Sequence, residues 1–286
     1  MVEEQGAPAV WLIKESLVQT SGNIITMTDR PARRQLLQAL GLTATGSVIF
    51  PTAAKSAEDN FVFPAPPASS IGVFGTRRRF PVRRVYCMGR NYAAHAREMG
   101  DDPNVVPPFF FMKPADSIVA DDGDFPYPGH TKEVEHEIEM VVALKSGGVN
   151  IPESKALDCV FGYAVGLDMT RRDLQDLAKE LRRPWEAGKS FDHSAPCGPL
   201  YPVSVVGHPS RGRLWVAVNG KIKQQADLAD LIWPVPRMIA ELSSYFALAP
   251  GDVIFTGTPD GVAVVKRGDR IRGGVEGIGE IDINVV

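Results

Sequence analysis

Hydrophobic positions occur along much of the chain in short runs, and glycine or proline residues separate these runs. Apolar runs of roughly four to eight residues between such turns are typical of β-strands. We predict strands over residues 85–88, 137–144, 161–168, 253–255 and 281–286. We also predict a hairpin of residues 214–218 and 221–225, because Asn219 and Gly220 between them suit the positive φ angles of a type I′ turn.

Helical patterns are fewer. We expect short helices over residues 91–99 and 171–180 and a longer one over 235–246, where apolar residues recur at helical spacing. Strands outnumber helices and do not alternate with them regularly, so the sequence predicts an α+β fold that is mostly β. The glycine run at 273–279 precedes no helix, so hairpin turns explain it better than a dinucleotide site does.

The first 80 residues carry little of this pattern. We therefore divide the chain into an N-terminal extension with a proline-rich linker (1–80) and a catalytic domain (81–286). Residues 27–57 combine Arg33 and Arg34, a modest apolar stretch and small residues, as a twin-arginine export signal does. An ordinary amphipathic helix explains the same segment, and either Met1 or Met27 suits a start. We expect a cytoplasmic location, with the periplasm as the alternative.

Composition narrows the range of partners. The formal net charge is −3 and there is no polybasic segment, which argues against nucleic acid and anionic membranes as partners. No apolar run approaches the ~18–20 residues of a membrane span. The three cysteines lack metal-type spacing and are expected to be reduced thiols. A small anionic substrate must therefore be attracted by a local cluster of basic residues.

Two glutamates, Glu137 and Glu139, stand two positions apart in a predicted strand. Side chains at i and i+2 of a strand share a face, and two buried carboxylates that close need a cation between them. Asp168 ends the next predicted strand and supplies a third carboxylate. Three oxygen ligands favour Mg²⁺ or Mn²⁺, with Ca²⁺ as an alternative, over Zn²⁺. A solvated strand face is the competing explanation, and His136 is expected to point to the opposite face.

His95 and Glu98 stand three positions apart on the predicted helix 91–99 and are therefore neighbours on its surface. A carboxylate orients an imidazole and raises its basicity, which makes a general base for water. An exposed His–Glu pair is the alternative. Lys189 and Arg172 suit a carboxylate substrate and a developing enolate. The turn at 256–259 offers hydroxyl and amide groups for an oxyanion, although surface cations and a plain turn would explain these residues equally well.

Six motifs occur in the order seen in the fumarylacetoacetate hydrolase superfamily. They are YCMGRNYAAH (86–95), PFFFMKP (108–114), HEIEM (136–140), GLDMTRRD (166–173), GKSFD (188–192) and TGTP (256–259). Over about residues 80–286 the chain therefore resembles this superfamily. The resemblance implies the family's β-roll or barrel with flanking helices, usually in a homodimer.

The same resemblance implies roles for individual residues. The metal ligands would be Glu137, Glu139 and Asp168; the catalytic residues would be His95, Glu98 and Lys189; the substrate contacts would include Arg172, Gln175 and Thr258. REMG (97–100), FFFMKPADS (109–117), RPW (183–185) and FDHSAPCG (191–198) look most like fumarylpyruvate hydrolases of gentisate breakdown. These would cleave fumarylpyruvate to fumarate and pyruvate, with Arg90, Lys113 or Arg183 binding the distal carboxylate.

Three alternatives stay open. The chain could be a general acylpyruvate hydrolase. It could instead be an oxaloacetate decarboxylase, hydratase or isomerase, because these reactions use the same metal and enolate chemistry. A non-enzymatic scaffold would be favoured by loss of a metal carboxylate or of His95, and all of these residues are present.

Overall fold

The computed structural model describes residues 61–286, which form one compact unit, Phe61–Val286. The export-like segment 27–57 lies outside the described residues, so its role stays a prediction. No helix within residues 61–286 is long and apolar enough to cross a membrane.

The largest sheet has eight strands in the order β4-β3-β14-β7-β8-β10-β5, with β11 paired to β8 outside this path. Its strands are β3 (Arg84–Gly89), β4 (Phe109–Lys113), β5 (Ile118–Ala120), β7 (Ile138–Leu144), β8 (Val160–Leu167), β10 (Ala195–Cys197), β11 (Tyr201–Pro202) and β14 (Asp252–Phe255). Every residue of β7 is buried. A strand covered on both faces has a continuous apolar sequence instead of an alternating one, which is why this run was visible in the sequence.

A four-stranded antiparallel sheet packs against the larger one through contacts of β12 with β7 and of β17 with β8. Its strands are β12 (Arg213–Val218), β13 (Lys221–Asp227), β16 (Arg270–Val275) and β17 (Gly279–Asn284). In β17, Ile281 and Ile283 are buried, while Glu280 and Asp282 lie outward and pair with arginines of β16. One face therefore joins the core between the sheets.

Two smaller sheets complete the strands. They comprise β6 (Val134–His136), β9 (Thr170–Arg171) and β15 (Ala263–Val265) in one sheet, and β1 (Ser70–Gly72) and β2 (Arg79–Pro81) in the other. Ile71 and Phe80 of β1 and β2 are buried in a second apolar cluster with Val85 and Phe255. Residues 70–80 therefore pack as part of the compact unit, although we grouped them with the extension.

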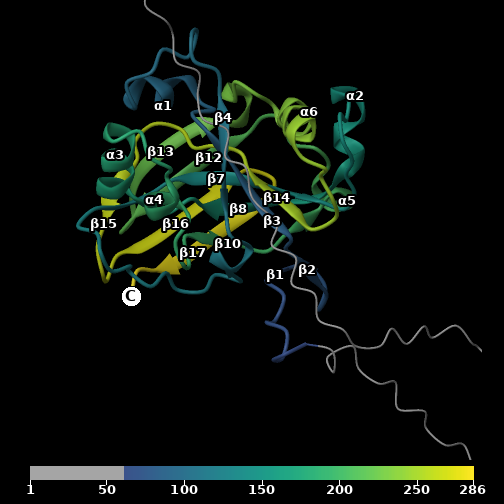
Figure 1. Cartoon of the computed structure of the whole chain (residues 1–286), viewed down its shortest axis with the longest axis horizontal. Coiled ribbons are helices and arrows are strands. Elements are labelled where there is room, and N and C mark those ends of the chain that lie inside the picture. The colour runs from purple at the N-terminus through teal and green to yellow at the C-terminus, as the bar shows by residue number, and fades with distance from the viewer. Residues whose placement is uncertain (1–60) are drawn as a thin grey trace, which may run out of the picture. The chain divides into compact units, whose positions relative to one another are not determined.

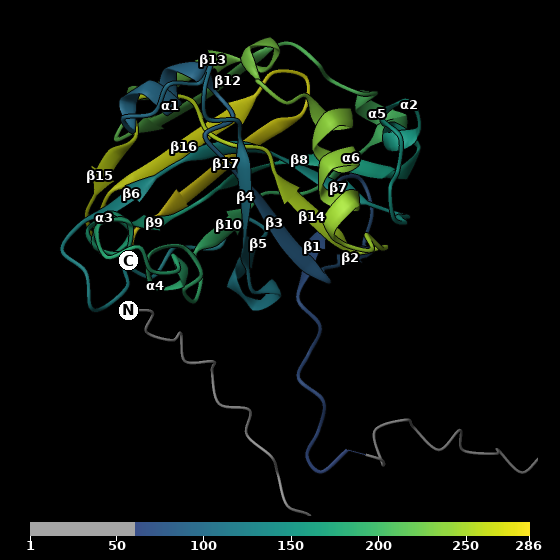
Figure 2. The same cartoon turned by 45° about the horizontal axis from the view of Figure 1, so that its top comes forward.

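The helices are short. They are α1 (Ala93–Glu98), α2 (Glu153–Ala156), α3 (Arg172–Glu180), α4 (Glu186–Lys189), α5 (Val203–Val206) and α6 (Val235–Tyr245), with 3₁₀ turns at Ala115–Ser117, Leu157–Cys159 and Leu228–Asp230. Figures 1 and 2 show α1, α3 and α4 on one side of the sheets, and α2, α5 and α6 on the other. The first group carries the candidate site, and Met238, Ile239 and Leu242 of α6 pack into the core.

The predicted fold class is confirmed, because curved mixed sheets dominate and helices flank them. The hairpin is where we predicted it, with Asn219 at φ 50° and Gly220 at φ 77°. The predicted strand 137–144 differs in one detail. Glu137 lies in the break between β6 and β7, two strands that belong to different sheets.

Candidate active site

Three carboxylates meet where β7 begins and β8 ends. The two strands are antiparallel, with Ile138 opposite Leu167, so the ends that carry Glu137 and Asp168 lie side by side. The Asp168 N–H donates to the Glu137 carbonyl at 2.8 Å. One oxygen from each of Glu137, Glu139 and Asp168 lies within 4.8 Å of the others, and all three residues are buried. Strand pairing therefore assembles the carboxylate cluster that the sequence predicted.

Cationic side chains surround Glu137. Lys189 Nζ lies 2.6 Å from Glu137 Oε2 and 2.9 Å from Asp168 Oδ2. Arg172 donates to Glu137 Oε1 at 2.6 Å and to Glu135 Oε2 at 2.5 Å. Burial alone would raise the pKa of Glu137, but Lys189 and Arg172 outweigh burial and hold this pKa well below its ordinary value. Glu137 is therefore ionised.

Glu139 has no such partner. Among the described residues it forms no ion pair, and Glu139 Oε2 accepts the Gly257 N–H at 2.8 Å. Burial raises the pKa of Glu139 well above its ordinary value, and the charges of Asp168 and Glu137 raise it further. A buried carboxylate repelled by two others lacks a positive charge, and a divalent cation held by all three would supply it. The residues present therefore fit a divalent metal site.

Two glycines allow this arrangement. Gly257 has φ +96°, and a Cβ there would lie 2.7 Å from the Cβ of Asn91, so the turn that reaches Glu139 needs glycine. A Cβ on Gly188 would lie 2.8 Å from the backbone N of Gln175. This close approach of α4 to α3 brings Lys189 beside the carboxylates. Although burial lowers the pKa of Lys189, Asp168 and Glu137 raise it above its ordinary value, so the side chain is an ammonium.

His95 lies on the wall of the cavity that these carboxylates share, and it is paired with Glu98. His95 Nδ1 is 3.0 Å from Glu98 Oε2, and Glu98 Oε1 accepts the Gly261 N–H at 3.0 Å. Because Glu98 is fixed at both oxygens, it favours the tautomer with the proton on Nδ1 of His95. The unprotonated Nε2 of His95 is then available as a base. The competing explanation of an exposed pair does not describe His95, which is only 5% exposed.

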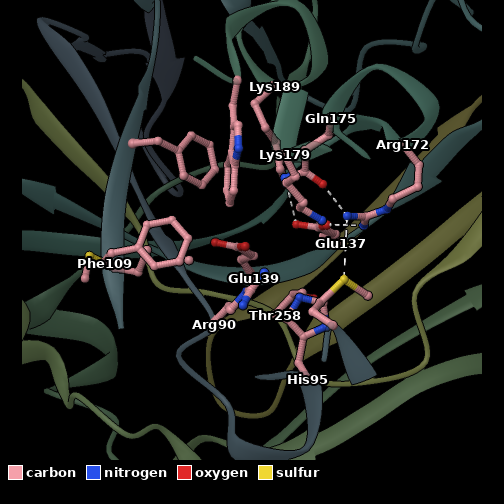
Figure 3. A pocket seen from close by; sticks show the side chains of 15 residues that line it. Arg90, His95, Phe109, Glu137, Glu139, Arg172, Gln175, Lys179, Lys189 and Thr258 are labelled. Carbon is pink, nitrogen blue, oxygen red and sulfur yellow. Dashed lines mark hydrogen bonds and ion pairs between the residues drawn. The ribbon is translucent and has the colours of Figure 1, made fainter. Parts of the chain in front are cut away.

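An open cavity connects these groups. Its lining includes His95, Glu137, Glu139, Arg172, Gln175, Lys189, Thr258, Arg90, Lys179, Met88, Gly89, Met99, Phe109, Phe111 and Trp185 (Figure 3). Phe109 meets Trp185 edge-on, with ring centroids 5.3 Å apart. The cavity therefore has a carboxylate floor, formed by Glu137 and Glu139, and an aromatic wall. Small-molecule sites commonly combine a few polar groups with apolar walls in this way.

Most of the predicted site residues line this cavity, but four do not: Glu98, which holds His95 from behind the lining, and Asp168, Lys113 and Arg183. Asp168 is behind the floor, where its carboxylate completes the cluster. Lys113 is 2% exposed, lies 2.8 Å from Asp168 and donates to the backbone carbonyl of Lys189. Arg183 is exposed and is not among the lining residues. Lys113 and Arg183 thus lie outside the cavity in which a distal carboxylate would bind.

The Thr258 hydroxyl is engaged within the protein. Its Oγ1 donates to the Ile138 carbonyl at 2.8 Å and accepts from Gln224 Nε2 at 2.8 Å. The hydroxyl proton is thus unavailable to substrate, and the Gly257 N–H already binds Glu139. The donor that this turn can offer to an oxyanion is the backbone N–H of Thr258.

Gln224 joins a distant hairpin to the site. Its Oε1 accepts from the Ile138 N–H at 3.1 Å and lies 3.0 Å from Nδ1 of the fully buried His136. Its Nε2 also donates to the Pro259 carbonyl at 2.6 Å. Burial lowers the pKa of His136 to about 4, so this ring is neutral. His136 is not among the lining residues, and its contact with Gln224 links β6 to the hairpin.

Replacement of Gln224 by leucine is expected to lower the free energy of unfolding by ~1–3 kcal/mol, because buried donors and acceptors lose their partner. Urea unfolding would measure this change. Gln225→Leu is the matched control. The neighbouring glutamine is exposed, and among residues 61–286 its side chain bonds only Arg213, so a change within about 0.5 kcal/mol is expected. Equal stability losses in the two variants would contradict a special role for Gln224.

Three charged or polar side chains of the site were missed in the sequence. Glu135 extends the i, i+2 series of Glu137 and Glu139, so its spacing was an available signal. Lys179 follows Arg172 by seven residues and Gln175 by four, which is helical spacing. Gln224 carried no signal, because its partners are 34 or more residues away along the chain.

Comparison with known proteins agrees with this site. The family model for the fumarylacetoacetate (FAA) hydrolase C-terminal domain matches residues 84–286. The crystal structure of fumarylpyruvate hydrolase from Pseudomonas aeruginosa, in complex with Mn²⁺ and pyruvate, is 51% identical, with a TM-score of 0.78, over 79% of this chain and 99% of that one.

Two curated relatives show the range of activities. Fumarylpyruvate hydrolase of Ralstonia sp is 41% identical over 64% of this chain and 95% of its own length. The mitochondrial oxaloacetate tautomerase of Arabidopsis thaliana is 40% identical over 71% of this chain and 90% of its own. With its buried acidic site for a divalent metal, the chain belongs to the fumarylacetoacetate hydrolase family and is a metal-dependent enzyme of that family.

Proposed function

We propose that this enzyme hydrolyses the C3–C4 bond of a 2,4-dioxo acid, with fumarylpyruvate as the favoured substrate. The observation that carries the proposal is that His95, held by Glu98, lines one cavity with Glu137 and Glu139. Hydrolysis needs a base for water close to the place where an enolate is stabilised. A metal site without such a base would support only enolate reactions in which no water attacks.

The carboxylates, Arg172 and Gln175 have separate roles in binding the substrate. A divalent cation held by Glu137, Glu139 and Asp168 would polarise the 2-oxo acid end and neutralise negative charge that develops there. Arg172 is fixed by Glu135 and Glu137 and holds Gln175 through a hydrogen bond. Gln175 therefore keeps its amide N–H₂ group for the substrate.

The proposed reaction begins when Nε2 of His95 removes a proton from water and the water oxygen bonds to C4. The tetrahedral intermediate then collapses, and the C3–C4 bond breaks with its electron pair moving to C3. The ammonium of Lys189, 2.6 Å from Glu137 Oε2, lies where it can stabilise the resulting pyruvate enolate. His95 returns its proton to C3, so the products are pyruvate and the second carboxylic acid.

Support for the substrate comes from the relatives. A solved structure that is 51% identical carries the name of fumarylpyruvate hydrolase and is a complex with Mn²⁺ and pyruvate. The product side of the proposed reaction is thus represented in a similar protein. A homodimer, the gentisate pathway and a cytoplasmic location remain predictions.

Oxaloacetate tautomerase activity is the second candidate, because a relative with this name is 40% identical over 71% of the chain. Such a reaction moves a proton between carbon and oxygen and needs no attacking water. The His95–Glu98 pair could carry that proton instead. Oxaloacetate decarboxylation would use the same enolate chemistry and would release carbon dioxide.

The assay that separates these reactions follows the ultraviolet enol band of each substrate in the presence of Mg²⁺ or Mn²⁺, together with released pyruvate. We expect kcat/KM for fumarylpyruvate to exceed that for acetylpyruvate by at least ~10²-fold, because a site built for a second carboxylate rejects an analogue without it. Equal values would indicate a general acylpyruvate hydrolase. Faster conversion of oxaloacetate would indicate a decarboxylase if carbon dioxide appears and a tautomerase if it does not.

A further inference from the structure

One face of α3 runs outward from the carboxylate floor of the cavity. Arg172, Gln175 and Lys179 are spaced by three and four residues, which places them on one side of the helix, and all three line the cavity (Figure 3). At a helical rise of about 1.5 Å per residue, Lys179 lies roughly 10 Å farther along the axis than Arg172. A ligand held at the floor and extended along this face would reach Lys179.

Lys179 is held where it can meet such a ligand. Its side chain is 27% exposed, so it is largely covered yet reachable from solvent. Lys179 Nζ lies 2.9 Å from Asp176 Oδ1 and 5.7 Å from the centre of the Trp185 ring. Asp176 is 59% exposed, so water screens this ion pair and weakens it. A better-desolvated anion from the cavity side can therefore compete with Asp176 for the ammonium.

The positive charges around Lys179 also favour an anionic ligand there. Burial lowers the pKa of Lys179, Asp176 opposes that effect, and the nearby charges of Arg172 and Arg90 lower it further. Three cations thus approach one another around the cavity. Arg172 already has two carboxylate partners, Glu135 and Glu137. A substrate carboxylate at the outer end would relieve the remaining repulsion.

The other cations that could bind a distal carboxylate are placed less well. Lys113 is enclosed behind the floor, and Arg183 lies outside the lining. Arg90 lines the cavity but forms an ion pair with Asp101, and its side chain is 14% exposed, so that pair is less screened than the one of Lys179. Lys179 is the lining cation whose existing partner is most exposed to water.

We propose that Lys179 binds the second carboxylate of a dicarboxylic 2,4-dioxo acid and so determines the preference for substrates with an anionic tail. This inference rests on the proposed function, because the proposed function places the 2-oxo acid end of the substrate at the carboxylate floor. Lys179 acts in binding the substrate and takes no part in the bond cleavage, which we assign to His95 and Lys189.

Two non-hydrolysable ligands test the proposal by binding alone. Both 2-oxoheptanedioate and 2-oxoheptanoate have the 2-oxo acid end and the same chain length, and only the first has a terminal carboxylate. Calorimetric titration of the Mn²⁺-loaded enzyme is expected to show roughly 10–100-fold tighter binding of 2-oxoheptanedioate, the scale of a hydrogen bond to a charged group. Lys179→Met is expected to remove this preference, whereas Lys179→Arg retains most of it.

Lys155→Met is the matched control. Lys155 also pairs with an aspartate three residues away, Asp158, but that pair is highly exposed and Lys155 is not among the lining residues. This variant is expected to bind both ligands as the wild type does. Oxalate, which occupies only the floor, should bind Lys179→Met with unchanged affinity and so show that the metal end is intact.

Turnover gives the second readout. In Lys179→Met, kcat/KM for fumarylpyruvate should fall roughly 10–100-fold, mainly through KM, while kcat/KM for acetylpyruvate stays within about twofold. A preserved preference for 2-oxoheptanedioate in Lys179→Met would overturn the assignment. If the wild type hydrolyses neither dioxo acid, the proposed function fails, and the binding titration still decides the role of Lys179.

Discussion

Chelation of the divalent metal with EDTA is expected to abolish activity, and added Mg²⁺ or Mn²⁺ to restore it. A cation that neutralises an enolate contributes several kcal/mol to the transition state, so the loss should be at least ~10³-fold. The structural reason is Glu139, a buried carboxylate without an ion-pair partner among the described residues. Full activity in the chelated enzyme would contradict the metal-dependent mechanism.

Glu139→Gln tests the same metal site by changing one of its carboxylates instead of removing the metal. The amide has the shape of the carboxylate but lacks its charge, so we expect Mn²⁺ binding, measured by calorimetry, to be lost together with activity. The metal-free variant should unfold at a higher temperature than the metal-free wild type, because repulsion by Asp168 and Glu137 is removed. This result would separate loss of metal from misfolding. Glu153→Gln, at an exposed glutamate, should bind Mn²⁺ normally.

The second large effect is expected at the base. His95→Ala should lower kcat for hydrolysis by ~10²–10⁴-fold, the usual contribution of a general base. Mn²⁺ binding and the affinity for oxalate should be retained, since the His95 ring forms its hydrogen bond with Glu98 and not with the carboxylate floor. Pre-steady-state measurement of pyruvate release would show whether the chemical step is the one affected.

Two comparisons sharpen this test. Exogenous imidazole should restore part of the activity of His95→Ala, because the variant leaves space at the cavity wall where His95 was. His130→Asn, at an exposed histidine, should behave as the wild type. If His95→Ala hydrolyses the substrate at a near-normal rate, His95 is not the base and another base must be found.

The chain's local spacing determined much of the site. The carboxylates of Glu137 and Glu139 share a face because i and i+2 do so in extended backbone, even with the break between β6 and β7 at Glu137. His95 and Glu98 meet because i and i+3 are neighbours on a helix. The continuous apolar runs of β7 and β8 marked two central strands, since strands covered on both faces need no polar alternation. Such relations depend on a few consecutive residues and can be read without the fold.

The tertiary structure decided which distant groups meet these side chains. Sequence alone could not show that Lys113 is enclosed behind Asp168, nor that the Thr258 hydroxyl is occupied by Ile138 and Gln224. A charged or polar residue has the same local pattern whether it faces a cavity or a buried partner. Strand order and helix packing select between the two, because they bring together groups far apart in the chain and leave buried polar atoms only the partners within reach.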